Sequence, residues 1–379
     1  MKKLLLVANV SKEHIRKFHI PFIMEMTSKG WQVDVACRLD APIPECHQAY
    51  DLPCDRNPFR GGIVKSIFII RQLLRKNQYD VIHCHTITGS LVARIAAAPF
   101  RKKGLKVFYT NHGLHFFPGA PWYRWAIGYP MEKFLAHKTD LLITINQEDY
   151  ETAHHYLKEC KSIEQIHGIG VDLQRFYDAA KNTDRNSYRK QLGLCDNDIV
   201  ITYVAELNKN KNQESLIKVF SILQQKLPNA KLMLVGPDHY NGKIQTIAAK
   251  AGISDHVLFL GWRNDVPQLL SISDIYAATS YSEGLGLNII EAMACHLPVV
   301  AFMNRGHNEI IQDNITGYLI NPDDVSTMAD KICMLANDHL LVYTMTQNAQ
   351  NTIIQYETSH VLRCLNAIYD KYTSAQQYS

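Results

Sequence analysis

The sequence predicts an α/β protein with two doubly wound parallel-sheet domains. The chain has 379 residues, which is more than one ordinary hydrophobic core accommodates and suits two domains. Short apolar segments alternate with helical segments along most of its length. Hydrophobic residues make up 46% of the chain and charged residues 20%, as in folded globular proteins.

Composition excludes several classes of protein. No run of eighteen apolar residues occurs, so no membrane-spanning helix is predicted. The basic start of the chain is followed by a short apolar run and then Asn9, which predicts a first strand rather than a signal peptide. Nine cysteines without a Cys-x-x-Cys pair favour a reducing compartment, the cytoplasm, and argue against a zinc site.

Charge is distributed unevenly over the chain, whose net charge is +4. The first 180 residues carry an excess of Lys and Arg, and the remainder an excess of Asp and Glu. The first half is therefore the better candidate to meet an anionic partner, such as a lipid phosphate or the inner face of the cell membrane. No nucleic-acid-binding motif accompanies this charge, so no nucleic-acid partner is expected.

The predicted first domain opens with a strand, a helix and a second strand, the usual start of a doubly wound domain. In such folds ligands bind beyond the carboxyl ends of the strands, so segments that follow strands are candidate sites. The expected elements are strand 3–10, helix 21–28, strand 31–36, helix 63–75, strand 79–85, helix 89–98, strand 107–110, strand 140–146 and helix 148–157.

Several histidines lie near these strands. His14 and His19 belong to the polar segment 9–19, which most simply forms a solvated loop. They are weak candidates for contact with an acceptor substrate. His83 and His85 share one face of a strand, but no further ligands lie close by in the sequence. A structural or substrate role is therefore expected for His83 and His85 rather than a metal site.

His112 directly follows the predicted strand 107–110 and stands beside a glycine, which places it at the candidate site. The segment 115–129 that follows is unusually aromatic and partly basic. Two interpretations are open: an interfacial surface for a lipid-linked acceptor, or a buried loop between helices. The candidates for acceptor contact in this segment are Phe116, Phe117 and Trp122.

The predicted second domain again alternates strands with helices. Its expected elements are strand 199–204, a helix that ends at 223, strand 231–235, strand 257–263, helix 266–272, strand 275–278 and helices 325–336 and 339–356. The domains are expected to span 1–172 and 173–358. Residues 178–196 form a linker followed by a short helix, and the last segment, 359–379, packs back on the first domain as a helix.

The stretch from Glu283 to Pro298 carries the clearest chemical signal. Glu283 lies beside two glycines on a predicted loop, and Glu291 lies in the first turns of a predicted helix. Glycines before a helix allow the backbone to approach a ligand, and the amides at a helix start suit an anion such as a diphosphate. An acid on the loop can meet a sugar hydroxyl, and an acid on the helix can accept both hydroxyls of a ribose.

This stretch resembles the Glu-x7-Glu motif of the family 4 retaining glycosyltransferases, which have the GT-B fold of two Rossmann-like domains facing a central cleft. The flanks agree, with Ser280-Tyr281-Ser282 before the motif and Pro298-Val299-Val300 after it. The resemblance covers nearly the whole chain and is most specific over 199–322. It implies that Glu283 lies by the donor sugar and that Glu291 holds the nucleotide ribose.

The resemblance assigns further residues. Lys211 holds the position of a lysine opposite the donor diphosphate, whose charge an ammonium would neutralise. Where relatives carry an arginine, this chain has Glu206, so that arginine's role does not carry over; either Lys209 compensates or the donor is held differently. His112 is expected near donor sugar and acceptor. The other expected donor-side residues are Gly284, Leu285, Gly286, Leu287, Trp262, Arg263 and Gly170.

The segment from His112 to Pro121 resembles a branch of the family found in bacterial capsule and exopolysaccharide clusters. The resemblance implies transfer of a hexose or N-acetylhexosamine from a nucleotide sugar, UDP-linked, to a polyprenyl-diphosphate-linked glycan. No Asp-x-Asp motif stands at a strand end, so neither a metal nor another cofactor is expected. Two alternatives are open: a nucleotide-sugar epimerase of the same fold, and a non-catalytic partner protein, which Glu206 in place of arginine would suit.

Overall fold

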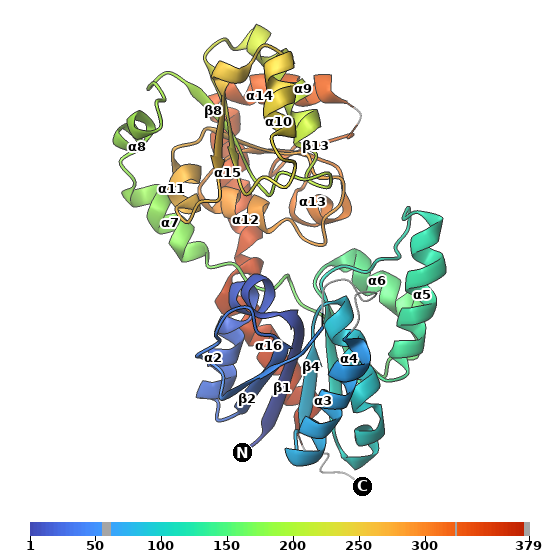
Figure 1. The fold of residues 1–379 in the computed structure, drawn as a ribbon. Helices are drawn as coiled ribbons and strands as arrows, with labels where there is room; N and C mark the ends of the chain where they lie inside the picture. The colour runs from blue at the N-terminus through green and yellow to red at the C-terminus, as the bar shows by residue number, and fades with distance from the viewer. Residues whose placement is uncertain (55–61, 323, 375–379) are drawn as a thin grey trace. The chain divides into compact units, whose positions relative to one another are not determined.

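The computed structural model describes residues 1–54, 62–322 and 324–374 (Figure 1). The chain divides into two compact units. The first comprises Met1–Gly170 together with the C-terminal segment that begins at Thr358, and the second comprises Val171–Glu357. Each unit is built around one parallel sheet, so the predicted fold class is confirmed.

The first unit contains a seven-stranded sheet in the order β3-β2-β1-β4-β5-β6-β7. Its pairings are all parallel among the described strands. The strands are β1 (Lys3–Val10), β2 (Gln32–Arg38), β3 (Gln48–Asp51), β4 (Val81–Cys84), β5 (Lys106–Asn111), β6 (Leu141–Thr144) and β7 (Ile163–Gln165). The helices are α1 (Arg16–Phe18), α2 (Ile20–Ser28), α3 (Ile63–Lys76), α4 (Ile87–Ala97), α5 (Trp122–Ala136), α6 (Gln147–Tyr156) and α16 (Thr358–Thr373).

The second unit contains a six-stranded parallel sheet in the order β10-β9-β8-β11-β12-β13. The strands are β8 (Ile199–Val204), β9 (Ala230–Val235), β10 (Val257–Gly261), β11 (Ile275–Ala278), β12 (Val299–Phe302) and β13 (Tyr318–Ile320). The helices are α7 (Leu173–Asn182), α8 (Arg185–Gln191), α9 (Gln213–Lys226), α10 (Lys243–Lys250), α11 (Val266–Ser271), α12 (Leu287–Ala294), α13 (Arg305–Ile310), α14 (Val325–Asn337) and α15 (His339–Ile353).

The central strands are apolar along their whole length rather than alternating. In β1 the run Leu4–Ala8 is fully buried, and in β12 the run Val299–Phe302 is fully buried as well. This pattern is what a parallel sheet covered by helices on both faces requires. Within the described residues, no helix has both the length and the apolar character needed to cross a membrane.

Helix α16 is last in the sequence but belongs to the first unit, where it lies beside α2 (Figure 1). The Tyr369 hydroxyl lies 2.8 Å from Nδ1 of buried His83 on β4. Asn366 donates from Nδ2 to Oε1 of Glu25 on α2, at 2.8 Å. The final helix therefore completes the covering of a sheet whose strands are formed much earlier in the chain.

The segment 9–19 is not the solvated loop that we expected. Strand β1 continues to Val10, and a turn of π-helix over Ser11–Ile15 leads into α1. The backbone and hydroxyl of Ser11 both donate to Oδ1 of Asp40, at 3.1 and 2.7 Å. This link between residues distant in sequence folds the segment inward and leaves His19 buried.

The aromatic segment 115–129 also differs from a loop, because α5 begins within it at Trp122. Helix α5 is tied to α4 by a buried ion pair in which Arg94 donates to both carboxylate oxygens of Glu132, at 2.8 and 3.1 Å. Removing one partner of such a pair typically costs about 3–5 kcal/mol. In the segment 178–196, the predicted short helix is α8, but the part before it differs from a linker because α7 extends to Asn182.

Candidate functional site

Two predicted catalytic residues of the second unit meet at the edge of its sheet. Lys211 follows the carboxyl end of β8 and Glu283 follows that of β11, and these strands are neighbours at the point where the strand order reverses. Open α/β sheets place their ligands at this position. The Lys211 Nζ lies 2.6 Å from the Glu283 Oε1, and both side chains are partly buried.

The loops that carry this pair are fastened to each other. Asn210 donates from Nδ2 to the carbonyl oxygen of Ser282 at 2.9 Å, and the amide of Tyr281 donates to the carbonyl of Asn210 at 2.8 Å. The hydroxyl of Thr279 donates to the carbonyl of Asn212, also at 2.9 Å. The ammonium and the carboxylate are therefore presented by two loops that hold one another in place.

Gly306 and His307, at the start of α13, form the wall behind Glu283. A Cβ atom on Gly306 would lie 2.6 Å from the Cβ of Glu283, so any larger residue would displace the acid. His307 is fully buried, and burial lowers its pKa to about 4. Its Nδ1 lies 2.6 Å from the carbonyl of Phe302, while its Nε2 has no hydrogen-bond partner among the described residues. No sequence motif pointed to these two residues.

The start of α12 supplies backbone amides beside the same loop. Gly286 occupies the N-cap and offers no side chain to accept hydrogen bonds from the first turn. A Cβ at Gly286 would lie 3.3 Å from Cδ2 of His307, so the backbone already approaches its neighbours closely. An uncapped helix start of this kind favours an anionic ligand.

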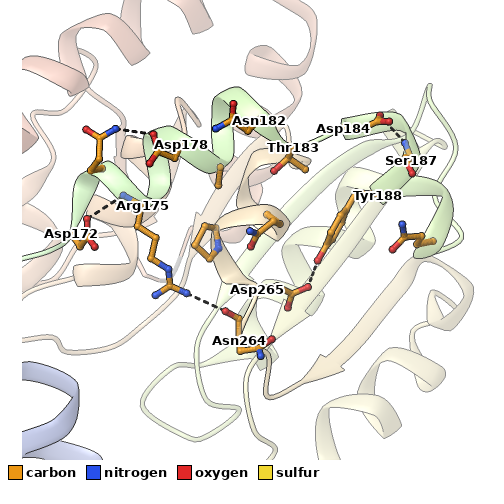
Figure 2. Close-up of a pocket in the computed structure, with 15 residues that line it drawn as sticks. Asp172, Arg175, Asp178, Asn182, Thr183, Asp184, Ser187, Tyr188, Asn264 and Asp265 are labelled. Carbon is orange, nitrogen blue, oxygen red and sulfur yellow. Dashed lines mark hydrogen bonds between the residues drawn. The ribbon is translucent and has the colours of Figure 1, made fainter.

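Glu291 lies in the second turn of α12 and is half-buried. Burial raises its pKa to about 7, and the positive charge of Arg175 on α7 opposes this shift. Figure 2 shows Arg175 extending from α7 to Asn264, whose carbonyl accepts from its Nη2 at 3.1 Å. The carboxyl group is therefore poised to change its protonation state near neutral pH.

Arg175 lines a polar hollow of about 940 Å³ between α7, α8 and the segment 264–268 (Figure 2). Helix-capping acids and internal hydrogen bonds form much of its wall: Asp172 caps α7, Asp184 caps α8, and the Tyr188 hydroxyl donates to Asp265. None of the donor-side residues predicted from the sequence lines this hollow. This hollow is therefore not the primary candidate site.

The residues predicted near the nucleobase lie after β10. The Trp262 side chain is 71% exposed. The guanidinium of Arg263 donates to both carboxylate oxygens of Asp265, at 2.7 and 2.5 Å. The Arg263 side chain is therefore held by an acid, and a base at this position would meet backbone groups and the indole.

Glu206, which replaces the usual arginine, is exposed, and its Oε2 lies 3.8 Å from Nε2 of His239. Lys209 lines a pocket of about 460 Å³ that also contains Lys218 and Lys243. Lys243 is paired with Glu214 on the same wall, at 2.5 Å.

In the first unit, four histidines gather at the carboxyl ends of neighbouring strands. His14 and His19 follow β1, His85 follows β4 and His112 follows β5, and these strands are adjacent in the sheet. The Nε2 atoms of His14 and His19 are 3.1 Å apart, and Nδ1 of His85 lies 3.2 Å from Nε2 of His112. We call these four residues the histidine cluster.

Burial lowers the pKa of three members of the histidine cluster. It lowers the pKa of His112 to about 4 and, with the charges of neighbouring histidines, holds the pKa values of His19 and His85 well below the usual range. His83 lies outside the cluster, because its ring nitrogens bind Tyr369 and the hydroxyl of Thr110. No further histidine lies close to His83 and His85 in the sequence, but parallel pairing brings distant histidines next to His85 in the fold.

A pocket of about 390 Å³ opens beside the histidine cluster and is lined by His14 and His112 among others. Thr86 on its wall has a φ of 61°, an uncommon conformation for a residue other than glycine and a sign of local strain. Asn9, also on the wall, is buried, and its Oδ1 has no hydrogen-bond partner among the described residues. The pocket is therefore a polar site, at the carboxyl ends of the strands, whose wall contains a strained residue and a buried oxygen without a partner among the described residues.

The remaining candidates have separate positions. Phe116 is fully buried against Trp125 and Tyr129, so its assignment as an acceptor contact is wrong. Phe117 is partly exposed, and Trp122 is 79% exposed at the start of α5. Gly170, at the end of the first unit's main segment, has a φ of 92°, and a Cβ there would lie 2.9 Å from the Cα of Thr358. The left-handed backbone and the close approach to Thr358 both account for this glycine.

Comparisons with known proteins identify the family of the chain. Residues 3–146 match the family described as "Glycosyl transferase 4-like", and residues 184–352 match "Glycosyl transferases group 1". A protein of Bacillus subtilis (strain 168) named as glycosyltransferase EpsD is 36% identical over 371 residues, covering 98% of this chain and 97% of its own. The UDP-Gal:alpha-D-GlcNAc-diphosphoundecaprenol alpha-1,3-galactosyltransferase of Escherichia coli is 26% identical, covering 92% of this chain and 90% of that protein.

Among solved structures, Anabaena Alr3699/HepE in complex with UDP and glucose superimposes with a TM-score of 0.79. The match covers 98% of this chain and 100% of that chain, at 22% sequence identity, and shows a shared fold. Together with the family matches and the relative from Bacillus subtilis, this match confirms the predicted family and the predicted fold class. The chain belongs to the family 4 type of group 1 glycosyltransferases and has their GT-B fold.

Proposed function

We propose that this glycosyltransferase moves a hexose or N-acetylhexosamine from a UDP-linked donor to a polyprenyl-diphosphate-linked glycan, with retention, in surface polysaccharide synthesis. The observation that carries the donor half of this proposal is the Lys211–Glu283 pair beside the uncapped start of α12. The name of the Escherichia coli relative supports both halves, because it specifies UDP-Gal and a diphosphoundecaprenol-linked sugar.

In the proposed reaction, the second unit binds the donor. The Lys211 ammonium and the amides of Gly284 to Leu287 neutralise the diphosphate as the bond between sugar C1 and the phosphate oxygen breaks. Glu283 meets the donor sugar, and Glu291 accepts hydrogen bonds from the ribose hydroxyls. These groups stabilise separated charges, so they act in the transition state more than in the ground state.

The first unit serves the acceptor in this scheme. His112, on the wall of the 390 Å³ pocket, positions the acceptor hydroxyl or the donor sugar. The hydroxyl attacks C1 from the face that the diphosphate leaves, and its proton passes to the departing phosphate. The new C1–O bond therefore keeps the configuration of the donor.

Donor binding is expected to need no divalent ion, because Lys211 and the α12 amides already supply positive charge to the diphosphate. Transfer measured in the presence of EDTA should proceed at the same rate as in added Mg²⁺. A requirement for Mg²⁺ or Mn²⁺ would contradict this part of the proposal.

Helix α5 is proposed to lie at the membrane surface, where a polyprenyl-linked acceptor resides. Its exposed apolar residues, Tyr123, Ile127 and Phe134, recur at the spacing of one helical face, and Trp122 is exposed beside them. Lys133 is exposed on the same helix and is paired with Glu159 at 3.5 Å. Sedimentation with anionic vesicles should carry the protein down, and Ile127→Glu should weaken this binding.

The proposed activity is tested with purified protein, radiolabelled UDP-sugars and a polyprenyl-diphosphate glycan. The expected product is a glycan longer by one sugar, and its anomeric proton reports the retained configuration. Conversion of the sugar without any acceptor would indicate an epimerase instead. No UDP binding by calorimetry would indicate a protein that keeps the fold without the donor site.

A further inference from the structure

We propose that the histidine cluster of His14, His19, His85 and His112 is a binding site for a divalent transition-metal ion of the Zn²⁺ class. Each residue offers one ring nitrogen, and these four atoms lie within 4.8 Å of one another. The four residues come from the ends of three adjacent strands rather than from one flexible loop. The site is thus assembled by the fold.

The separations match a tetrahedral shell. Zinc binds imidazole nitrogen at about 2.0–2.1 Å, which places tetrahedral ligands about 3.3 Å apart. The His14–His19 and His85–His112 contacts, at 3.1 and 3.2 Å, already have this spacing. Only the wider pairs, up to 4.8 Å, must contract by rotation of the rings for four nitrogens to meet one ion.

The burial of the rings also suits a metal. Zinc binds the neutral imidazole, and the rings of His19 and His85 are buried away from solvent. His85 is buried, and its Nε2 has no hydrogen-bond partner among the described residues. A buried ring nitrogen without a partner is costly, so the histidine cluster retains polar capacity that its internal hydrogen bonds do not use.

The donor set predicts which ions bind. Four imidazoles select Zn²⁺, Co²⁺, Ni²⁺ or Cu²⁺, whereas Mg²⁺ and Mn²⁺ prefer carboxylate and carbonyl oxygens. The group contains no Asp or Glu. His14 and His112 reach the 390 Å³ pocket, which gives an ion a path from solvent.

This inference and the proposed function share one residue, His112. A metal bound to Nε2 of His112 would occupy the ring nitrogen and hinder its proposed role in positioning the acceptor or the donor sugar. If the proposed function is right, transfer proceeds in EDTA and is inhibited by micromolar Zn²⁺. The metal site itself does not depend on that activity.

The competing explanation is a network of neutral histidines joined by hydrogen bonds and hydrated by water. A small cavity of about 20 Å³, lined by His19, His83 and His85 among others, has room for about one water molecule. Such a network would bind no metal with measurable affinity, so metal titration separates the two explanations.

The experiment uses the full-length protein without a histidine tag, stripped of metal with a chelator and titrated with CoCl₂, ZnCl₂ and MgCl₂. Four-coordinate Co²⁺ gives visible absorption bands much stronger than those of the aquo ion. We expect one Co²⁺ per chain with these bands, displacement by one Zn²⁺, and no response to Mg²⁺. Calorimetry gives the stoichiometry and affinity independently.

Variants locate the site. His14→Gln and His112→Gln should weaken Zn²⁺ binding by about 100-fold or more, since even loss of an outer-shell partner typically costs 10–100-fold. His339→Gln, which changes an exposed histidine in the second unit, should bind like the parent protein. Circular dichroism confirms that each variant is folded, and His85→Gln is avoided because its ring is buried.

The proposal is overturned if Co²⁺ gives no tetrahedral spectrum, or if the His14 and His112 variants bind Zn²⁺ as tightly as the parent. Competition by Mg²⁺ at equal concentration would also overturn it. An inactive protein that still binds one Co²⁺ in this way would support the metal site and count against the proposed transferase role alone.

Discussion

At the scale of single residues, Lys211 and Glu283 contact each other, although each is proposed to bind a different part of the donor. Lys211 is proposed to bind the diphosphate and Glu283 the sugar. Without donor, each side chain neutralises the other at 2.6 Å in a partly buried place. A bound diphosphate would compete for the ammonium and release the carboxylate toward the sugar. This exchange explains why a lysine, whose ammonium is a mobile point charge, suits the position better than a rigid guanidinium would.

Replacing Lys211 with Ala should lower kcat for sugar transfer about 100- to 1,000-fold, the range typical for removal of one group that stabilises developing negative charge. The thermal midpoint should change little, because the side chain is only partly buried. Steady-state kinetics with a UDP-sugar measures the effect. Lys250→Ala, at the exposed end of α10, is the control and should keep parental kcat. An equal loss in both variants would show that kcat depends on the overall positive charge rather than on Lys211.

Glu291 should make UDP binding depend on pH. Its raised pKa, about 7, means that the carboxylate needed for the ribose hydroxyls is present above neutrality and is lost as pH falls through 7. Calorimetry between pH 6 and 8 should therefore show weaker UDP binding at the acid end. Glu291→Gln should bind UDP weakly at all pH values and show no change in affinity between pH 6 and 8. The control variant Asp255→Asn, at an exposed position, should keep the pH dependence of the parent protein.

The same group has the opposite effect on folding stability. A carboxyl whose pKa is higher in the folded than in the unfolded protein binds more protons when folded. Its contribution to stability is present at acid pH and is lost as pH rises through about 7. Glu291→Gln should therefore stabilise the protein more at pH 8 than at pH 5, a sign that denaturant titrations at both pH values will check.

At the scale of elements, the site depends on a close approach between α13 and the loop that carries Glu283. Gly306 permits this approach because it lacks a Cβ, which would lie 2.6 Å from the Cβ of Glu283. Gly128, inside α5, differs: a Cβ there would make ordinary contacts at 3.6 and 3.7 Å, with His115 and Phe116. The two glycines therefore make a matched pair for substitution.

Gly306→Ala should cost about 1–3 kcal/mol, as overpacking does, and should also displace Glu283 and reduce kcat. Gly128→Ala should stabilise the protein by about 0.5–1 kcal/mol, because glycine is unfavourable inside a helix. Urea unfolding and steady-state kinetics test both. A Gly306→Ala protein with parental kcat would show that Glu283 does not need its present position.

At the scale of the whole molecule, the first unit is built from both ends of the chain. The first unit is completed by α16, whose Tyr369 binds His83 directly behind the histidine cluster. The second unit is continuous in sequence, from Val171 to Glu357. The two units should therefore respond differently to loss of the C-terminus.

Truncation after Glu357 should unfold the first unit and leave the second folded. The truncated chain loses the apolar face of α16, and buried His83 loses its contact with Tyr369. Calorimetric scanning should show the transition of the second unit alone, and trypsin should degrade the first 170 residues. As a control, Tyr369→Phe in the full chain should keep both transitions, with a lower midpoint for the first unit.

The sequence by itself determined the alternation of strands and helices, the glycine–acid stretch and the lysine before α9. These are local patterns, in which apolar runs and glycine positions act over a few neighbouring residues. The sequence also indicated His112, because the apolar strand before it is recognisable and ligands of such folds bind just beyond the strand's carboxyl end. The burial of Phe116 was not predictable in this way, since an aromatic residue next to a helix start can face either side.

Only the tertiary structure decided which side chains share a site. His14, His19, His85 and His112 converge because β1, β4 and β5 are adjacent in a sheet whose spatial order differs from chain order. Gly306 and His307 reach Glu283 for the same reason, through the adjacent strands β11 and β12. Parallel pairing between distant segments leaves no local pattern in the sequence, so the histidine cluster and the wall behind Glu283 became visible only in the folded chain.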